Sequence, residues 1–168
     1  MRHAGSMALC IDKITGSRER NPMGNCLKVG ILGAGNIAGS MAEALNELQK
    51  EGKACAYAVA SRSQEKALEF ARKWNITRAY SSYEELASDP EVDLIYIATP
   101  HSLHYEQAKL CMEHGKNVLV EKAFTANARQ AEELFAMAEE KKVFITEAIW
   151  TRYMPSREII TGLLREGV

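Results

Sequence analysis

A glycine-rich turn early in the chain has the residue types and spacing that most directly predict chemistry. A short apolar run leads into Gly33 and Gly35, and a segment of helical period begins directly after them. In a strand–turn–helix of this kind, the first glycine permits the tight turn and the second lets the backbone approach a phosphate. The N–H groups of the first helical turn can then bind a dinucleotide pyrophosphate. That turn holds Asn36, Ile37 and Ala38, the last being the small third residue that lets helix and strand pack closely.

The residues after the second apolar run, 54–60, indicate which nucleotide is bound. They are Ser61, Arg62 and Ser63. NAD-selective sites usually place an acidic residue here for the ribose hydroxyls, whereas a guanidinium flanked by hydroxyls suits a 2′-phosphate. The sequence therefore favours NADP, with NAD still open if Arg62 is only a solvated surface arginine. An S-adenosylmethionine-dependent methyltransferase would also need an acidic residue here, so Ser61 and Arg62 argue against that alternative.

The elements that would position these residues follow a regular alternation. From residue 27 onward, short apolar runs alternate with segments of helical period. This alternation is typical of repeated βαβ units, so we predict that residues 27–150 form an α/β domain with a doubly wound parallel sheet of the Rossmann type. Ligands of such sheets bind outside the carboxyl ends of the strands. The expected strands are 27–32, 54–60, 78–80, 93–98, 117–120 and 143–146.

Local signals predict where several helices begin, end and face the core. Ser82 and Glu85 have the spacing of a capping box. Gly115 suits a left-handed helix cap, and Asn127 is the expected N-cap of the next helix. The apolar spacing predicts helix core positions that include Ile37, Met41, Leu45, Phe70, Trp74, Leu134, Phe135 and Ala138.

Polar segments after the later strands give the chain a family resemblance. Residues 99–104 read TPHSLH, residues 120–123 read VEKA, and residues 147–152 read EAIWTR. With the glycine turn, these motifs resemble the Gfo/Idh/MocA family of oxidoreductases over about residues 27–166. The segment 147–152 is most similar to the branch that contains dimeric dihydrodiol dehydrogenase.

The resemblance implies roles for individual residues. The lysine of the family's E-K-P motif matches Lys122, which would lie near the nicotinamide and hydrogen-bond the reacting oxygen of the substrate. A lysine there can donate to a developing alkoxide, or move a proton when its pKa is lowered. Glu121 would face the nicotinamide ribose or form a structural ion pair, and His104 would reach the site or pack beside it. The other implied cofactor contacts are Thr99, Pro100, His101, Trp150 and Arg152.

Two features depart from the family pattern. Ala123 stands where the family most often has proline, so the loop of Lys122 lacks a fixed φ and keeps a backbone N–H. The resemblance implies a C-terminal α/β domain that we expect this chain to lack, and residues 151–168 are expected to be the helix that connects to it. We therefore expect the cofactor-binding half of an NADP-dependent oxidoreductase for a sugar, polyol or dihydrodiol-type alcohol, with little or no turnover by this chain alone.

A second hypothesis comes from a different functional class. A non-catalytic module would bind or sense the nucleotide and dock with a partner chain that carries the missing half. Tight nucleotide binding without turnover, together with a co-purifying partner, would favour it. For the full-length family, the resemblance also implies assembly as a homo-oligomer.

Composition argues against several other classes. The 168 residues include 21 basic and 22 acidic side chains, so neither nucleic acid nor an anionic membrane is an expected partner. The four cysteines are scattered and the histidines lack metal-ligand spacing, so we expect no metal and reduced thiols in a cytoplasmic protein. No apolar run approaches the roughly 20 residues that span a bilayer. Residues 1–26 have no sustained period and are expected to be a loosely ordered extension, with Met23 a candidate for the true start.

Overall fold

The computed structural model describes residues 26–149, 151 and 154–167. The predicted N-terminal extension therefore lies outside the described residues except for Cys26, and so do Trp150 and Arg152. The predicted domain limits at residues 27 and 150 remain predictions.

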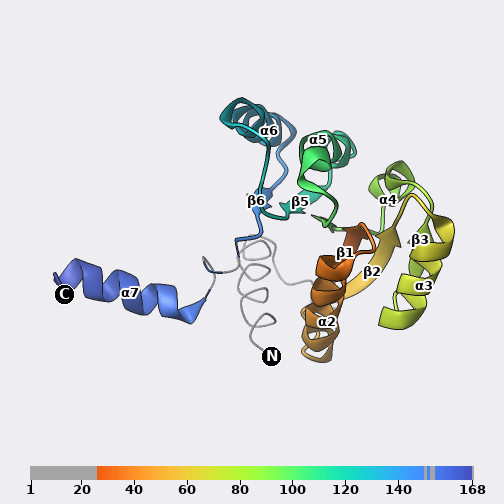
Figure 1. Cartoon of the computed structure of the whole chain (residues 1–168), viewed down its shortest axis with the longest axis horizontal. Coiled ribbons are helices and arrows are strands. Elements are labelled where there is room, and N and C mark those ends of the chain that lie inside the picture. Colours follow the sequence, from red (N-terminus) through yellow and green to blue (C-terminus); the bar gives the residue numbers. More distant parts are fainter. Residues whose placement is uncertain (1–25, 150, 152–153, 168) are drawn as a thin grey trace.

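A six-stranded sheet forms the centre of the fold. Its strands are β1 (Leu27–Leu32), β2 (Ala54–Ala60), β3 (Arg78–Tyr80), β4 (Leu94–Ile97), β5 (Asn117–Val120) and β6 (Ile145–Glu147). All neighbouring strands are parallel, and their order is β3-β2-β1-β4-β5-β6 (Figure 1). This is the doubly wound order of a Rossmann fold, which confirms the predicted fold class.

Helices cover both faces of the sheet (Figure 1). They are α2 (Asn36–Lys50), α3 (Gln64–Trp74), α4 (Tyr83–Ser88), α5 (His104–Glu113) and α6 (Ala128–Lys141), with a 3₁₀ turn, η1 (His101–Leu103), before α5. Side chains of α2 and α3 pack with Ile31 and Tyr96 on one face of the sheet. Side chains of α4, α5 and α6 pack with Leu32 and Ile97 on the other. Because both faces are covered, the inner strands β2 and β4 carry no charged side chain and are largely buried.

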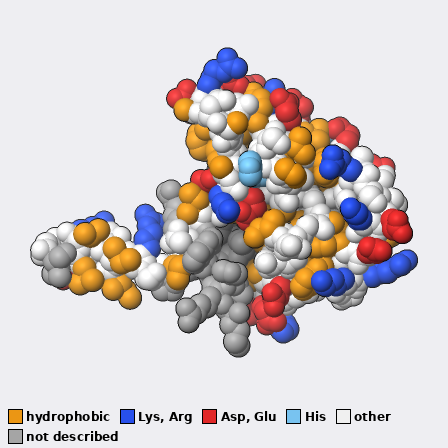
Figure 2. All heavy atoms as spheres, in the orientation of Figure 1, with side chains coloured by type: hydrophobic (Ala, Val, Ile, Leu, Met, Phe, Trp, Pro, Cys, Tyr) orange, Lys and Arg blue, Asp and Glu red, His pale blue; other side chains and the backbone are white. Residues whose placement is uncertain are grey.

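A last helix, α7 (Pro155–Glu166), extends away from the sheet (Figure 1). Its hydrophobic side chains are visible at the left end of the molecule in Figure 2. Ile159, Ile160, Leu163 and Leu164 are all exposed there. Among the described residues, no helix combines the length and the apolar character needed to cross a membrane.

The predicted helix caps are confirmed. The Ser82 hydroxyl accepts from the Glu85 backbone N–H at 3.1 Å, and the Glu85 carboxylate accepts from the Ser82 N–H. The Asn127 side chain accepts from the Gln130 N–H at 3.0 Å. Gly115 has φ +71°, the left-handed conformation that its position after a helix requires. These signals succeed because each cap depends only on residues within one helical turn.

Two predicted core positions are wrong. Ile37 is 45% exposed, because it lies at the solvent-facing start of α2 beside the exposed Gly35 and Asn36. Phe135 is 53% exposed and stacks on Phe124 with ring centroids 5.3 Å apart. The sheet-facing stripe of α6 is formed by Leu134 and Ala138, and Phe135 lies one residue around the helix from it. The ends of β4 and β6 also shift by one or two residues from the predicted ranges.

Candidate functional site

The carboxyl ends of four neighbouring strands meet at one edge of the sheet, here called the carboxyl edge. Leu32 pairs with Ala60 on one side and with Ile97 on the other, and Ile97 pairs with Val120. With neighbouring strands about 4.8 Å apart, this row spans roughly 14 Å. The predicted site residues that follow these strand ends are Gly33, Gly35, Ser61, Arg62, Thr99, Pro100, His101, Glu121 and Lys122.

Gly33 lets the chain turn sharply after β1, between the ends of β2 and β4. Its φ is +103°, a conformation that side-chain-bearing residues rarely adopt. Its N–H donates to the Ala60 carbonyl at 2.8 Å. A Cβ at this position would lie 2.9 Å from the Ala98 carbonyl oxygen, so both the backbone angle and the lack of space require glycine.

The turn continues into a helix start that is open to solvent. Gly35 is the N-cap of α2, and no side chain caps the helix there. A Cβ built on Gly35 would meet no other atom within 4 Å. Asn36 is exposed while Ala38 is fully buried, so the helix packs closely on the sheet and presents its first N–H groups outward. This arrangement can bind an anion through the backbone alone.

A groove of about 540 Å³ begins at this turn and lies between α2 and α3. The Trp74 ring forms part of its wall, and Gly39 allows the close approach, since a Cβ there would lie 3.3 Å from the ring. The charged side chains that line the groove are Glu43, Lys66, Glu69 and Lys73. Because both signs are present in equal number, the groove by itself selects no ligand charge.

The end of β2 presents Arg62 between two anchored serines. The Ser61 N–H donates to the Tyr80 carbonyl at 3.2 Å, which ties this end of β2 to β3. The Ser63 hydroxyl caps α3 by accepting from the Lys66 N–H at 3.4 Å. Arg62 is exposed, and no hydrogen bond or ion pair to another described residue engages its guanidinium. The guanidinium is therefore available to an anion at the carboxyl edge.

His104 is buried beneath the edge and joins two of its loops. The side chain is only 1% exposed. Its Nε2 lies 2.9 Å from the Thr99 carbonyl oxygen and its Nδ1 lies 2.8 Å from the Ala123 carbonyl oxygen. Both ring nitrogens thus face main-chain groups, which links the loop after β4 to the loop that carries Lys122.

Glu121 accepts a hydrogen bond from a tyrosine of β4, Tyr96. The Tyr96 hydroxyl donates to one Glu121 carboxylate oxygen, and the Lys122 backbone N–H donates to the other at 3.1 Å. Burial, followed by the nearby Glu121 charge, raises the pKa of Tyr96, so its hydroxyl remains a donor. The Lys122 side chain is exposed, and its ammonium has no partner in the described part of the chain. The peptide bond between Lys122 and Ala123 is cis.

Sequence reasoning missed three residues that support this edge. Tyr96 holds Glu121, Gln107 accepts from the Thr99 hydroxyl, and Glu147 accepts from the Phe124 N–H at 2.8 Å. Tyr96 did carry a signal, because it is the one side chain with a hydroxyl in the aliphatic run Leu94–Ile97. Gln107 and Glu147 had no such signal. Their roles depend on which distant loop lies opposite them.

The carboxyl edge thus offers backbone N–H groups, a guanidinium and an ammonium along one line. Within the described residues, no three histidine, cysteine, aspartate or glutamate side chains gather as a metal site would require. These groups could recognise an elongated, multiply anionic molecule, and the Lys122 ammonium stands at the β5 end of the row.

A family profile matches most of this region. The profile, described as an oxidoreductase family with an NAD-binding Rossmann fold, matches residues 27–148. The match includes β1, the glycine turn and every strand of the sheet.

Curated relatives cover the same region. The chain is 43% identical over 141 residues to trans-1,2-dihydrobenzene-1,2-diol dehydrogenase of Mus musculus, covering 84% of the chain and 42% of the relative. It is 40% identical over 150 residues to D-xylose 1-dehydrogenase (NADP(+)) of Hypocrea jecorina, covering 84% of the chain and 38% of that protein. The chain therefore spans about two fifths of the length of the curated relatives that it matches.

Solved structures show the same fold. A 3-ketoreductase from Actinomadura kijaniata, crystallised with TDP-benzene and NADP, superposes with a TM-score of 0.77 at 32% identity, covering 86% of this chain and 45% of that one. An NAD-binding oxidoreductase from Klebsiella pneumoniae superposes with a TM-score of 0.77 at 28% identity, covering 84% of this chain and 39% of the other.

Proposed function

Because the chain belongs to the Gfo/Idh/MocA oxidoreductase family, whose matching profile is that of an NAD-binding Rossmann fold, we propose that its carboxyl edge binds NADP. The full protein would transfer a hydride between this cofactor and a secondary alcohol. The observation that supports the proposal best is the order of the groups along the edge. Arg62 follows β2, the glycine turn follows β1, and Lys122 follows β5, which is the order that an extended dinucleotide needs.

Each part of the nucleotide has a proposed partner along this row. Ser61 and Arg62 would bind the 2′-phosphate of the adenosine, and the helix start after Gly35 would bind the pyrophosphate. The nicotinamide half would lie over the ends of β4 and β5. Its neighbours there would be Thr99, Pro100, His101 and Glu121, with Trp150 and Arg152 as further predicted contacts.

Lys122 is the proposed catalytic residue. The bound nicotinamide would supply or accept the hydride. The Lys122 ammonium would donate a hydrogen bond to the substrate oxygen, which stabilises negative charge as an alkoxide develops. Its exposure and its lack of a partner among the described residues support this role, since the ammonium need not leave another contact first.

Three residues would position Lys122 without touching the substrate. Tyr96 orients Glu121, and Glu121 accepts from the Lys122 backbone N–H. His104 contacts the Ala123 carbonyl oxygen from the other side. We therefore assign His104 to positioning rather than to cofactor contact, because both of its ring nitrogens already face main-chain oxygens.

The proposed substrates are a sugar, a polyol or a dihydrodiol-type alcohol. This class follows the names of relatives that act on dihydrobenzenediol and on D-xylose. Assembly of the full-length protein as a homo-oligomer stays a prediction. The chain spans about two fifths of those relatives, so the direct test is nucleotide binding, which the described residues would carry out.

A fluorescence titration with NADPH and with NADH tests the proposal. Wild-type chain should bind NADPH more tightly, and Arg62→Ala should weaken NADPH binding by about tenfold, the loss of one charge-assisted contact, while leaving NADH binding unchanged. Arg72→Ala, which removes an exposed arginine in the last turn of α3, is the matched control and should change neither affinity. Equal affinity of the wild type for both nucleotides would refute the role of Arg62. Failure of the folded chain to bind either would refute the site.

Activity of the full-length protein, rather than the titration, separates the second hypothesis from the first. A nucleotide-binding module without catalysis would bind NADPH equally well. If Lys122 is catalytic, the full-length protein should oxidise alcohols and Lys122→Ala should abolish that activity. If the protein only senses the nucleotide, the full-length wild type should already show no alcohol oxidation.

A further inference from the structure

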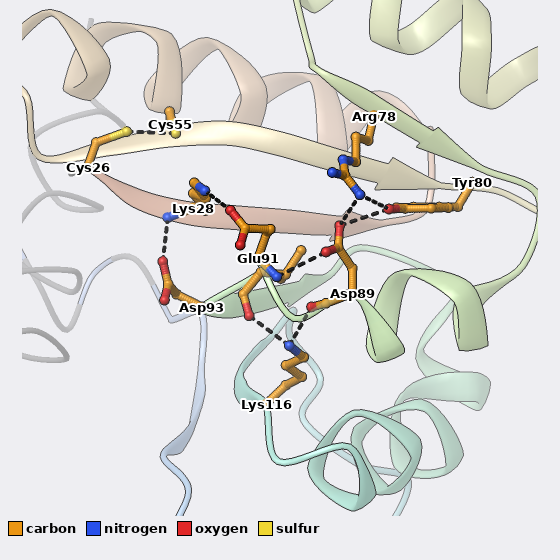
Figure 3. Close-up of polar contacts among 10 residues, drawn as sticks. Cys26, Lys28, Cys55, Arg78, Tyr80, Asp89, Glu91, Asp93 and Lys116 are labelled. Carbon is orange, nitrogen blue, oxygen red and sulfur yellow. Dashed lines mark hydrogen bonds and ion pairs between the residues drawn. The ribbon is translucent and has the colours of Figure 1, made fainter.

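Two cysteines face each other at the edge of the sheet opposite the proposed nucleotide site, here called the amino edge (Figure 3). Cys26 directly precedes β1, and Cys55 lies near the start of β2. Cys55 is the register partner of Lys28, which is two residues after Cys26, so both cysteine side chains project from the same face of the sheet.

The two sulfur atoms are close enough to react. Cys26 Sγ lies 2.7 Å from Cys55 Sγ, and the thiol of Cys26 donates to that of Cys55. A disulfide bond is about 2.05 Å long, so only a small movement separates the contact from a bond. Both side chains are half-buried, whereas Cys111 is fully buried in the sheet-facing side of α5. A pair of adjacent, partly accessible thiols differs in this respect from a structural cysteine.

The strand pairing keeps this contact in place. The Leu27 N–H donates to the Lys53 carbonyl at 3.0 Å, and Leu27 pairs with Ala54. These main-chain bonds fix the residues next to both cysteines. The sulfurs therefore meet because of the sheet register, although the two cysteines are 29 residues apart in the chain.

We propose that Cys26 and Cys55 form a reversible disulfide that locks β1 to β2 when the protein meets a thiol oxidant such as glutathione disulfide. The bond would enclose β1, the glycine turn and α2, the segment that carries the proposed pyrophosphate site. Disulfides of this kind in a reducing compartment are usually transient and redox-sensitive rather than structural.

The reaction balances as two thiol–disulfide exchanges. The Cys26 thiolate attacks glutathione disulfide, forms a mixed disulfide and releases one glutathione thiolate. The Cys55 sulfur then attacks Cys26 Sγ, loses its proton to solvent and releases the second glutathione. Two electrons pass from the protein thiols to the oxidant. Burial, and then the hydrogen bond with Cys26, raises the pKa of Cys55 to about 12, so we expect Cys26 to react first.

Peptide mapping of the native wild-type chain tests the bond directly. After treatment with glutathione disulfide, the intact mass should fall by about 2 Da, the mass of the two hydrogens lost. Trypsin cuts between the cysteines, so a non-reducing digest should join peptide 21–28 to peptide 54–62. Reduction should separate them again. Closing this loop should raise the melting temperature by about 5–10 °C.

Matched variants show which thiols are needed. The loss of mass should disappear in Cys26→Ser and in Cys55→Ser, with Cys26→Ala as a second replacement and folding checked by circular dichroism. It should persist in Cys111→Ser, and also in Cys10→Ser, a position outside the described residues. A stable glutathione adduct in place of the cross-link, or a cross-link that includes Cys10, would overturn the proposal. So would an unchanged mass in wild-type protein that is fully folded.

Discussion

The carboxyl and amino edges of the sheet carry similar charged residues in opposite situations. At the carboxyl edge, Arg62 and Lys122 are exposed, and neither side chain has a hydrogen-bond or ion-pair partner among the described residues. At the amino edge, Lys28 pairs with Glu91, and Lys116 donates to two carbonyl oxygens (Figure 3). Charges whose partners lie within the fold contribute to stability, whereas charges left without one are available to a ligand.

Asp89 and Lys116 form the centre of the amino edge. The Asp89 carboxylate is buried and accepts from the Tyr80 hydroxyl at 2.8 Å and from the Glu91 N–H at 3.0 Å. The Lys116 ammonium donates to the Asp89 and Val92 carbonyl oxygens. Burial lowers the pKa of Lys116, while the charge of Asp89 opposes that shift. This network joins the loop before β4 to the start of β5, so changes here should alter folding and spare binding.

The largest expected effect comes from Gly33→Ala. The backbone angle and the overlap with the Ala98 carbonyl together should destabilise the fold by about 3 kcal/mol, measured by chemical denaturation. NADPH binding should fall as well, because the turn must move. Gly52→Ala is the matched control, since Gly52 has φ +68° but open space around its Cβ position. A cost as small as that of the control, about 1 kcal/mol, would contradict the steric argument.

Lys116→Met should affect stability alone. The substitution keeps an unbranched side chain but leaves two carbonyl oxygens without their donor, which should cost about 2 kcal/mol. The affinity for NADPH should stay within about twofold, since Lys116 lies at the edge opposite the proposed nucleotide site. Lys141→Met, at an exposed position of α6, is the control and should be close to neutral. A large loss of affinity in Lys116→Met would contradict the separation of the two edges.

In contrast to Lys116→Met, Gly35→Ala should weaken NADPH binding and have little effect on stability. The new Cβ meets no protein atom and the backbone angle is an ordinary one, so the melting temperature should fall by no more than about 4 °C, the cost of alanine instead of glycine at an N-cap. The Cβ would instead lie where the pyrophosphate approaches, and NADPH affinity should drop by about tenfold, or ~1.4 kcal/mol. Unchanged affinity in the titration would move the proposed phosphate site away from this turn.

The smallest expected effect is the pH dependence of the pair Lys28 and Glu91. The Lys28 hydrogen bond and charge lower the pKa of Glu91 below its usual value, so the folded state favours the carboxylate. The stabilisation is therefore present above the unfolded pKa and is lost as the pH falls through the lower, folded value. Thermal melts from pH 6 to about pH 3 should show a shallower loss in Glu91→Gln than in the wild type. The difference should shrink at high salt, because both groups are exposed. A steeper loss in the variant would contradict the pairing.

The sequence was most informative about features that depend on near neighbours. The parallel α/β fold, the glycine turn and the caps at Ser82 and Asn127 were all predicted and are present. The wrong core assignments of Ile37 and Phe135 have a common cause. Helical period shows which residues share a stripe, but the edge of that stripe and the end of the sheet depend on how the helix is placed.

The contacts that support the candidate site were less predictable. The Tyr96 contact with Glu121 spans 25 residues, and the His104 contact with Ala123 spans 19. The cofactor roles assigned to individual residues stay predictions until binding is measured. What the structure adds is the position of each residue along the carboxyl edge and the partners that orient it.

The elements, their alternation and the turn at Gly33 follow from the amino-acid sequence, because period, capping and the conformational freedom of glycine act over a few neighbouring residues. The contacts of Tyr96 with Glu121, of His104 with two loops and of Cys26 with Cys55 became visible in the fold. Those pairings depend on strand order and register. Register is set by the packing of the whole sheet against its helices, to which residues far apart in the chain contribute together.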